Sequence, residues 1–587
     1  MKTIIDDLTA IAAAAFEKNE YDAALGTITL SDRPDLCQFQ CNGALAGAKM
    51  YRTAPKIIAG KIAEELEKSP VFQSVTVVNP GFINLVVTDS FLIEKANAVM
   101  ADPNLGIPQG DPGEKLILDY GGPNVAKPLH VGHLRAAVIG EALKRIARAT
   151  GRTVYGDVHL GDWGLQMGLV IAAMEEQNPE WCCFQTDFDP AEDTVPAISA
   201  AELNDIYPAA SKRSKEDEDF NRKAHEVTFE LQNGNPGYRA LWKAILAASI
   251  EDMKRIYDRL NVSFDFWYGE SDAQVFIEEL IQILEDKKLL YESQGALVVD
   301  VAEETDTYSI PPVIIQKSDK SFIYATTDLA TILMREKSLA PQGLWYIVDK
   351  RQSVHFEQVF RCARKAGLVP ATTELTHLPF GTMNGKDGKP YKTRDGGVMQ
   401  LSDLYAQVGE AISEKLSKDA FSSAEELEKT VNILSTAVIK FGDLINHREK
   451  DYIFDIEKFT ASEGKTGVYL LYTVTRMHSI LRKAGMFEEQ NRKPLTFLSS
   501  ESERQLLLDI LLSSVEFERA YADRAPNYLC EKAYAISSDF SKFYHENHIL
   551  SEENPEKKEN WLHLCLFTRR IMQTLLDVVG IDTVEFM

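Results

Sequence analysis

Residues 121–133, which read Gly-Gly-Pro-Asn-Val-Ala-Lys-Pro-Leu-His-Val-Gly-His, connect two segments of different periodicity. The apolar run 116–118 before them is typical of a buried strand. After them, Ile139, Leu143 and Ile146 recur at helical spacing. A strand, a glycine-containing turn and a helix N-terminus together form a site for a polyphosphate. This run therefore predicts a phosphate site at the end of a strand in an α/β domain.

Two histidines in this run, His130 and His133, are spaced so that both can point at the phosphates, and Gly132 leaves room for a flat base against the backbone. When a carboxylate attacks the α-phosphate of ATP, charge builds on the phosphoryl oxygens and on the leaving pyrophosphate, and donors aimed at that charge suffice for catalysis. The two imidazoles and the nearby Lys127 supply such donors. The alternative for so short a pattern is a loop with two exposed histidines.

Composition and charge narrow the class of protein. The 587 residues predict about three or four domains, and the 45% hydrophobic and 26% charged residues are typical of a soluble globular chain. The net charge of −25 argues against a generally basic nucleic-acid coat but leaves room for local RNA-binding patches. We find no signal peptide and no uncharged apolar run of about 18 residues, so we expect no membrane contact.

The seven cysteines are scattered, which is typical of a cytoplasmic protein. Cys37 and Cys41 lack a second pair at zinc spacing, so we expect no protein-bound metal and no tightly bound cofactor.

The order of expected helices and strands predicts the domain organisation. Residues 1–110 read as a separate α/β domain with strands at 75–78 and 82–87, followed by a Pro/Gly-rich linker at 104–113. Strands at 116–118, 153–155 and 344–348 alternate with helices, which indicates a doubly wound parallel sheet over 114–400. A polar insertion at about 177–310 interrupts it. From about 403 the chain is predicted to be helical, with a connecting region at 401–455 and a bundle at 456–587.

Several motifs, in this order, resemble those of the class I aminoacyl-tRNA synthetases, and among these the arginyl-tRNA synthetases. The resemblance covers nearly the whole chain. It rests on the run described above, on His-Leu-Gly-Asp-Trp-Gly at 159–164, on Tyr-Ala-Thr-Thr-Asp-Leu-Ala at 324–330, on Asp-Lys-Arg-Gln at 349–352, and on the segments 385–394 and 580–587. It implies a Rossmann-like catalytic domain, an N-terminal α/β domain that contacts the tRNA elbow and a C-terminal all-α anticodon-binding domain.

The resemblance also implies an activity and its partners. The activity is arginine–tRNA ligation with ATP and Mg²⁺, and the partners are tRNA(Arg) and L-arginine. The enzyme is expected to be monomeric and cytoplasmic, and to need bound tRNA before it activates arginine. Two alternatives stay open: a class I synthetase for another amino acid, and a synthetase-like RNA-binding protein without catalysis.

Arginine-binding residues follow from the resemblance at five positions: Asp119, Asn124, Tyr324, Asp328 and Gln352. A guanidinium needs carboxylates and planar acceptors, so we expect Asp328 to pair with it and Asn124 to hold the α-amino or carboxylate end. Tyr324 and Asp328 are four apart and share a face if a helix begins at Tyr324. The alternatives are a core aromatic for Tyr324, a helix-terminal charge for Asp328 and a structural role for Asp119.

The second class I signature loop departs from its usual form. Pro-Tyr-Lys-Thr at 390–393 stands where the class has Lys-Met-Ser-Lys, so the usual second lysine is missing. The resemblance implies that Lys127 takes over this charge. We expect Lys392 to bind ATP as well, although a solvated loop explains the loop lysines nearly as well.

RNA contacts are expected at both ends of the chain. By resemblance, Phe39, Asn42 and Asn84 contact the tRNA elbow, where an aromatic stacks on a base and amides read its edge. The alternative is a buried phenylalanine and turn asparagines.

In the C-terminal bundle, Arg476 and Lys483 are seven apart on one helix face and suit phosphates. A solvated face is the alternative. The resemblance adds Met587 as a residue that packs on the anticodon.

Overall fold

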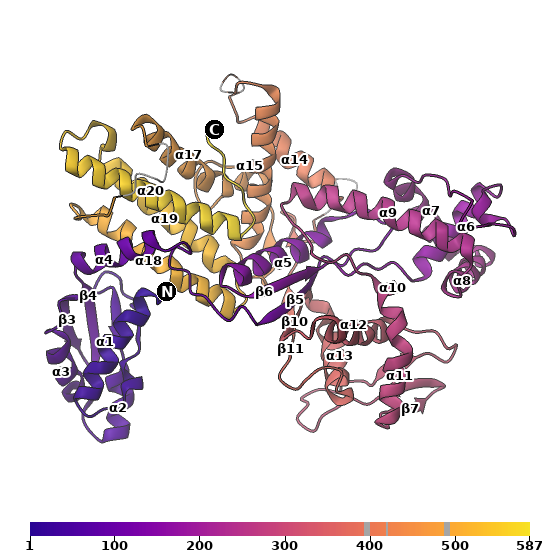
Figure 1. The fold of residues 1–587 in the computed structure, drawn as a ribbon, viewed down its shortest axis with the longest axis horizontal. Helices are drawn as coiled ribbons and strands as arrows, with labels where there is room; N and C mark the ends of the chain where they lie inside the picture. The colour runs from indigo at the N-terminus through magenta and orange to yellow at the C-terminus, as the bar shows by residue number, and fades with distance from the viewer. Residues whose placement is uncertain (392–398, 418, 420, 487–492) are drawn as a thin grey trace. The chain divides into compact units, whose positions relative to one another are not determined.

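The computed structural model describes residues 1–391, 399–417, 419, 421–486 and 493–587. These residues form two compact units. We call residues 111–148 and 152–461 the sheet unit, and residues 1–110, 149–151 and 462–587 the bundle unit (Figure 1). None of the described helices combines the length and the apolar character that a membrane crossing requires.

A four-stranded parallel sheet lies at the centre of the sheet unit, as the alternating strands and helices predict. Its order is β11-β10-β5-β6. The strands are β5 (Lys115–Tyr120), β6 (Thr153–Asp157), β10 (Gly343–Asp349) and β11 (Glu374–Phe380). The strand β6 lies on one side of β5. The chain then crosses from β6 to β10, which lies on the other side of β5. Ligands bind at the carboxyl ends of the strands at such a switch point.

Helices cover the sheet because its strands are apolar on both faces. On one face, α5 (Val131–Ala149) packs so closely on β5 that a Cβ at Gly140 would lie 2.2 Å from the Tyr120 ring. On the other face, α12 (Tyr324–Leu339) and α13 (Ser353–Ala366) share a buried cluster with Ile117 of β5 and Leu344 of β10. The helix α13 ends at Gly367, whose φ of 61° lies in the left-handed region that favours glycine.

The carboxylate of Glu141 on α5 is a buried charge of this core, with 1% of the residue exposed. It lies 2.9 Å from Lys144 Nζ and 2.6 Å from Arg145 Nε, and it accepts hydrogen bonds from the Tyr120 hydroxyl and the Ser263 amide. Burial opposes its ionisation, but Lys144, Lys440 and Arg145 lower the pKa of Glu141 to about 2. Its stabilising effect is therefore present above the unfolded pKa of about 4.3 and is lost as the pH falls toward 2.

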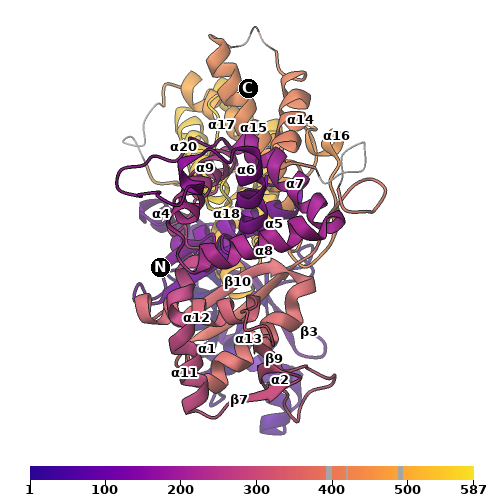
Figure 2. The ribbon, with the colours of Figure 1, turned by 90° about the vertical axis from the view of Figure 1, so that its right-hand side faces the viewer.

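The insertion between β6 and β10 has a helical part and a small sheet. The helices α6 (Leu165–Gln177), α7 (Ala200–Glu216), α8 (Glu218–Gln232) and α9 (Pro236–Arg259) pack on one another (Figure 2). They are followed by α10 (Glu270–Ala273), α11 (Ile277–Asp286) and an antiparallel sheet of β7 (Leu290–Ser293), β8 (Ala296–Val299) and β9 (Val313–Gln316). The unit is completed by β12 (Met383–Asn384), α14 (Leu401–Ser413), α15 (Ala424–Leu444), β13 (Tyr452–Ile453) and α16 (Ile456–Phe459).

The bundle unit combines the first and last parts of the chain. Its antiparallel sheet has the order β1-β2-β4-β3, with β1 (Ile28–Leu30), β2 (Phe39–Cys41), β3 (Phe72–Val78) and β4 (Phe82–Val87). The helices beside it are α1 (Ile4–Lys18), α2 (Gly43–Tyr51), α3 (Pro55–Leu66) and α4 (Asp89–Ala101). The C-terminal helices are α17 (Gly467–Lys483), α18 (Glu501–Ala522), α19 (Asn527–Glu546) and α20 (Pro555–Val578).

Polar contacts join these two parts of the bundle unit. Asn97 of α4 donates to the Leu495 carbonyl at 2.9 Å and accepts from the Leu495 amide at 2.8 Å. Arg504 of α18 is buried and pairs with Asp89 and with the carbonyl of Val87. Both contacts satisfy groups that would otherwise be buried without partners.

We expect Glu141→Gln to lower the free energy of unfolding of the sheet unit by about 3–5 kcal/mol, because it leaves buried cations without their counter-ion. Scanning calorimetry measures this as a lower Tm. The control is Glu176→Gln, since Glu176 pairs with Arg213 on the surface and such pairs contribute about 0–1 kcal/mol. Equal effects of the two variants would contradict the role given to Glu141.

Candidate active site

The loop between β5 and α5 lies at the switch point of the sheet and is held by backbone bonds on two sides. Val125 donates to the Gly161 carbonyl at 3.0 Å, and Val131 donates to the Met399 carbonyl at 3.0 Å. The second bond brings the chain that follows residues 392–398 against the two histidines. Lys392 itself is among the residues that the structure does not describe, so its predicted role lies outside the described residues.

His130 and His133 stack on one another with ring centroids 4.0 Å apart. The amide of His130 donates to His133 Nδ1, and the amide of Gly132 donates to His130 Nδ1, both at 3.1 Å. A neutral imidazole nitrogen that accepts a hydrogen bond carries no proton, so each ring proton lies on Nε2. The backbone thus leaves both rings with an outward donor.

Burial keeps both rings neutral. It lowers the pKa of His130, and the charge of Lys127 acts in the same direction. Burial, with the charges of His130 and Lys127, lowers the pKa of His133 to about 3. A Cβ at Gly132 would lie 2.8 Å from the His130 ring. Glycine is therefore required here by the histidine pair as well as by the expected base.

Asn124 lies where the loop meets the segment 159–164. Residues 124 and 161 form a parallel bridge, and a Cβ at Gly161 would lie 2.2 Å from Asn124 Oδ1. Glycine at 161 is thus what lets the Asn124 amide lie against the neighbouring backbone. The loop 121–133 and the segment 159–164 therefore form one local structure.

The helix α12 begins at Tyr324, which confirms the condition on which Tyr324 and Asp328 share a face. Tyr324 is 74% exposed, so it is no core aromatic. Asp328 Oδ2 lies 2.5 Å from His355 Nε2 of α13. Gln352 is exposed at the start of α13, just after β10, so it also lies at the carboxyl end of the sheet.

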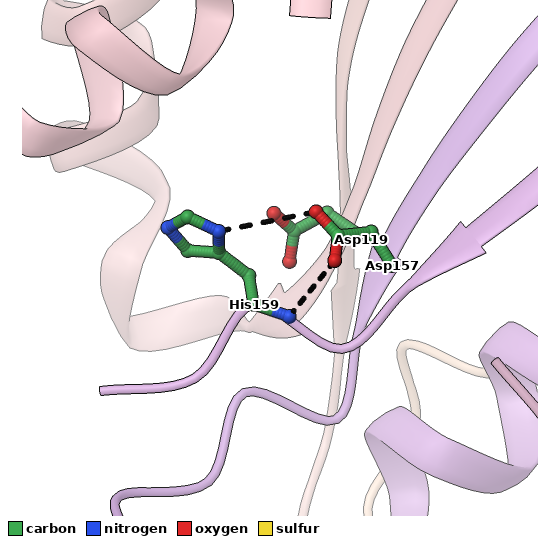
Figure 3. Close-up of side chains that lie close together, drawn as sticks. All are labelled: Asp119, Asp157 and His159. Carbon is green, nitrogen blue, oxygen red and sulfur yellow. Dashed lines mark hydrogen bonds and ion pairs between the residues drawn. The ribbon is translucent and has the colours of Figure 1, made fainter. Parts of the chain in front are cut away.

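Asp119 has a partner that the sequence did not suggest. Arg335, 2% exposed on α12, lies 2.7 Å from Asp119 Oδ2 and 2.5 Å from Asp157 Oδ2. Figure 3 shows Asp119 and Asp157 beside His159, whose Nδ1 is 3.9 Å from Asp157. The carboxylate and imidazole groups are close enough for a metal ion. The Arg335 guanidinium already pairs with both carboxylates and is their cationic partner, so this group does not fit a further, resident cation.

Glu270 is the functional candidate that sequence reasoning missed. It begins α10, and burial followed by the charges of Asp162 and Asp328 raises the pKa of Glu270 to about 8. Its charge in turn contributes to the raised pKa of Tyr324, after burial. A partly buried carboxyl whose pKa is affected by Asp328 is suited to a cationic ligand, because a cation would favour its ionised form. The only signal in the sequence was a glutamate after a glycine, which is too common to single out.

In the N-terminal part of the bundle unit, one RNA prediction is wrong. Phe39 is 0% exposed because its ring faces the core side of β2, so it cannot stack on a base. Asn84 is half-buried and accepts a hydrogen bond from Gln40 across the two strands at 2.8 Å. Asn42 is exposed before α2 and its side chain forms no cap bond, so its role stays a prediction.

A pocket of about 580 Å³ lies around Arg476 in the C-terminal helices. The Arg476 guanidinium lies over the rings of Tyr472 and Tyr544, 4.7 and 5.3 Å from their centroids, and donates to the Tyr472 hydroxyl. Rings and a cation on an open surface suit unpaired bases. Lys483 is exposed at the end of α17, and Met587 is half-buried at the chain end, so both stay predictions.

Comparisons with known proteins cover the whole chain. Residues 96–456 match the family described as tRNA synthetases class I (R), catalytic domain. Residues 2–87 match the arginyl tRNA synthetase N terminal domain, and residues 470–587 match the DALR anticodon binding domain.

Curated relatives match along their full length. The chain is 45% identical over 587 residues to an arginine–tRNA ligase of Alkaliphilus oremlandii, covering 100% of both chains. It is 41% identical to one of Francisella tularensis, covering 99% of both. Among solved structures, arginyl-tRNA synthetases of Thermus thermophilus (20% identical, TM-score 0.80) and Plasmodium falciparum (22% identical, TM-score 0.81) share the fold over 100% of each chain.

We expect the His133 ring to stay neutral, with its proton on Nε2, from pH 5 to 8. Nitrogen NMR of histidine-labelled protein checks this, and the signal that His133→Gln removes identifies the ring. The denatured protein is the control, since its histidines titrate near pH 6.5. A His133 signal that titrates between pH 5 and 8 would contradict the hydrogen-bond and burial argument.

Proposed function

Since this chain belongs to the class I arginyl-tRNA synthetases, we infer that it is an arginine–tRNA ligase. It activates L-arginine with ATP and transfers it to the 3′ end of tRNA(Arg). The observation that supports this function is that two neutral histidines and a group of acidic residues lie at the same switch point of the sheet. Neutral imidazole donors face one side and carboxylates that suit a guanidinium face the other.

We propose that the phosphate end of the site is made by the loop 121–133. The outward Nε2 donors of His130 and His133 suit the charge that develops on the α-phosphate. Lys127 adds a mobile cation for the leaving pyrophosphate, and Gly132 admits the adenine. Lys392 is proposed as a further ATP ligand. Mg²⁺ enters with the nucleotide, bound through the substrate phosphates.

At the other end we propose that Asp328 and Glu270 face the guanidinium of the substrate, with Tyr324 and Gln352 beside them. Asn124 is proposed to hold the α-amino or carboxylate end. Asp119 contributes its remaining oxygen, because Oδ2 is already bound by Arg335. Two carboxylates against one cation favour arginine over amino acids with apolar side chains.

For tRNA we propose that the pocket around Arg476 and Tyr472 holds anticodon-loop bases, with Lys483 and Met587 nearby. Asn42 and Asn84 are proposed for the tRNA elbow. We further propose a monomer that works in the cytoplasm. The free cysteines of the described chain fit a reducing compartment.

The direct test mixes the protein with ATP, Mg²⁺ and bulk tRNA and offers labelled amino acids one at a time. We expect arginine alone to label the tRNA, and His133→Ala to lower the rate by about 100-fold or more, as loss of a transition-state donor does. Another amino acid labelling the tRNA would overturn the roles of Asp328 and Glu270. An unaffected His133→Ala variant would favour a protein that binds RNA without catalysis.

The ionisation of Glu270 predicts how arginine recognition depends on pH. Its charged form is lost as the pH falls below about 8, so the KM for arginine should rise by up to about tenfold per pH unit between 8 and 6.5. Glu270→Gln should raise this KM by about 10- to 100-fold, the effect of losing a charged hydrogen bond, and should remove the pH dependence.

The matched control is Glu278→Gln, because Glu278 is exposed on the next helix. It should leave the KM for arginine at every pH unchanged. The KM for ATP should be the same in all three proteins. A wild-type KM for arginine that is constant from pH 6.5 to 8.5 would contradict the role of Glu270.

A further inference from the structure

The helix α7 of the insertion faces the loop with the two histidines across a pocket of about 400 Å³. Lys127 and His130 line one side, and Gln400 lies with them. Lys212 and Lys215 line the α7 side, with Glu216 after them. The pocket therefore lies next to the proposed phosphate end of the site.

The pattern of α7 explains why these lysines face the pocket. Pro208, Lys212 and Lys215 are spaced by four and three residues, which places them on one helix face. Arg213 lies on another face, where it pairs with Glu176 and Asp217. A capping box at Ser199 and Glu202 determines where the helix begins.

The residues that line this pocket carry an excess of positive charge. Three lysines, Lys127, Lys212 and Lys215, line it together with one acidic residue, Glu216. In the described part of the chain, neither Lys212 nor Lys215 forms an ion pair, whereas Arg213 between them forms two. Like charges gathered around a cavity repel one another, and a polyanion between them removes that repulsion.

The middle of α7, which also lines the pocket, lies near the proposed arginine side. Tyr207 is one of the groups that raise the pKa of Tyr324, after burial and Glu270. Lys215 follows Tyr207 by eight residues, about 12 Å along a helix. The stretch of α7 that lines the pocket beside His130 therefore begins in the vicinity of Tyr324.

We propose that Lys212 and Lys215 bind the β- and γ-phosphates of ATP and the departing pyrophosphate, from the side of the pocket opposite Lys127. This inference rests on the proposed function. In that step the arginine carboxylate forms a bond to the α-phosphorus, and the bond from phosphorus to the bridging oxygen breaks. The electron pair leaves with pyrophosphate, and no proton moves. The two ammonium groups stabilise the added charge on the leaving group.

This assignment explains which residues supply the positive charge of the second lysine that the usual class I loop has and this chain lacks. Residues 390–393 carry Pro-Tyr-Lys-Thr instead. Lys127 supplies one cation from the loop, and Lys212 and Lys215 supply two more from the insertion. A helix of the insertion thus contributes residues to the site at the carboxyl end of the parallel sheet.

The test separates adenylate formation from transfer by using tRNA whose terminal ribose has been oxidised with periodate. With this tRNA bound, the rate of arginyl-adenylate formation and the inhibition constant of pyrophosphate are measured for K212A/K215A, K212Q/K215Q and K212R/K215R. We expect both neutral pairs to lower the rate and weaken pyrophosphate inhibition by about 10- to 100-fold. The arginine pair should stay within a few-fold of wild type, since charge is retained.

The control is Lys243→Ala on α9, an exposed lysine of the insertion outside the pocket, which should match wild type. Unchanged adenylate formation and pyrophosphate inhibition in the neutral pairs would overturn the proposal. A higher KM for intact tRNA with unchanged pyrophosphate inhibition would also overturn it, and would assign the lysines to RNA. If wild type itself forms no arginyl-adenylate, the proposed function fails instead.

Discussion

The buried carboxylate of Glu141 is the interaction on which the sheet unit depends. It joins the strand that precedes the phosphate loop, through Tyr120, to the helix that follows it, through Lys144 and Arg145. It also accepts a hydrogen bond from the amide of Ser263, which follows α9 in the long insertion. A charge this deep is tolerated only when all of its oxygens have partners. Strand, helix and insertion are therefore held in one arrangement.

That arrangement lets one sheet edge offer two different electrostatic environments. At the loop after β5, burial and Lys127 keep two imidazoles neutral, with their Nε2 protons outward. Near the start of α12, burial and neighbouring carboxylates raise the pKa of Glu270. The same loss of water thus leaves neutral imidazoles at one end and raises the pKa of a carboxyl at the other, and these are the two environments on which the proposed roles rest. Helix α7 lies near both.

Much of this could be predicted from local pattern. The strand, turn and helix around 121–133 and the strands β6 and β10 all follow from periodicity and turn residues. Strand β11 went unpredicted. Phe39 was wrong because a pattern does not say which face of a short strand is buried. The sequence did not single out Glu270, Arg335 or Tyr544, because the residues that each of them contacts or influences are distant in sequence.

The sequence by itself determined the family, the order of the domains and the strand, turn and helix around residues 121–133, because these depend on neighbours along the chain. Only the tertiary structure decided which protons the histidines carry, that Asp119 already has a partner in Arg335, and that the lysines of α7 face the loop. The physical reason is range. Backbone conformation is set by a few adjacent residues, whereas burial and charge depend on groups brought together from hundreds of residues apart.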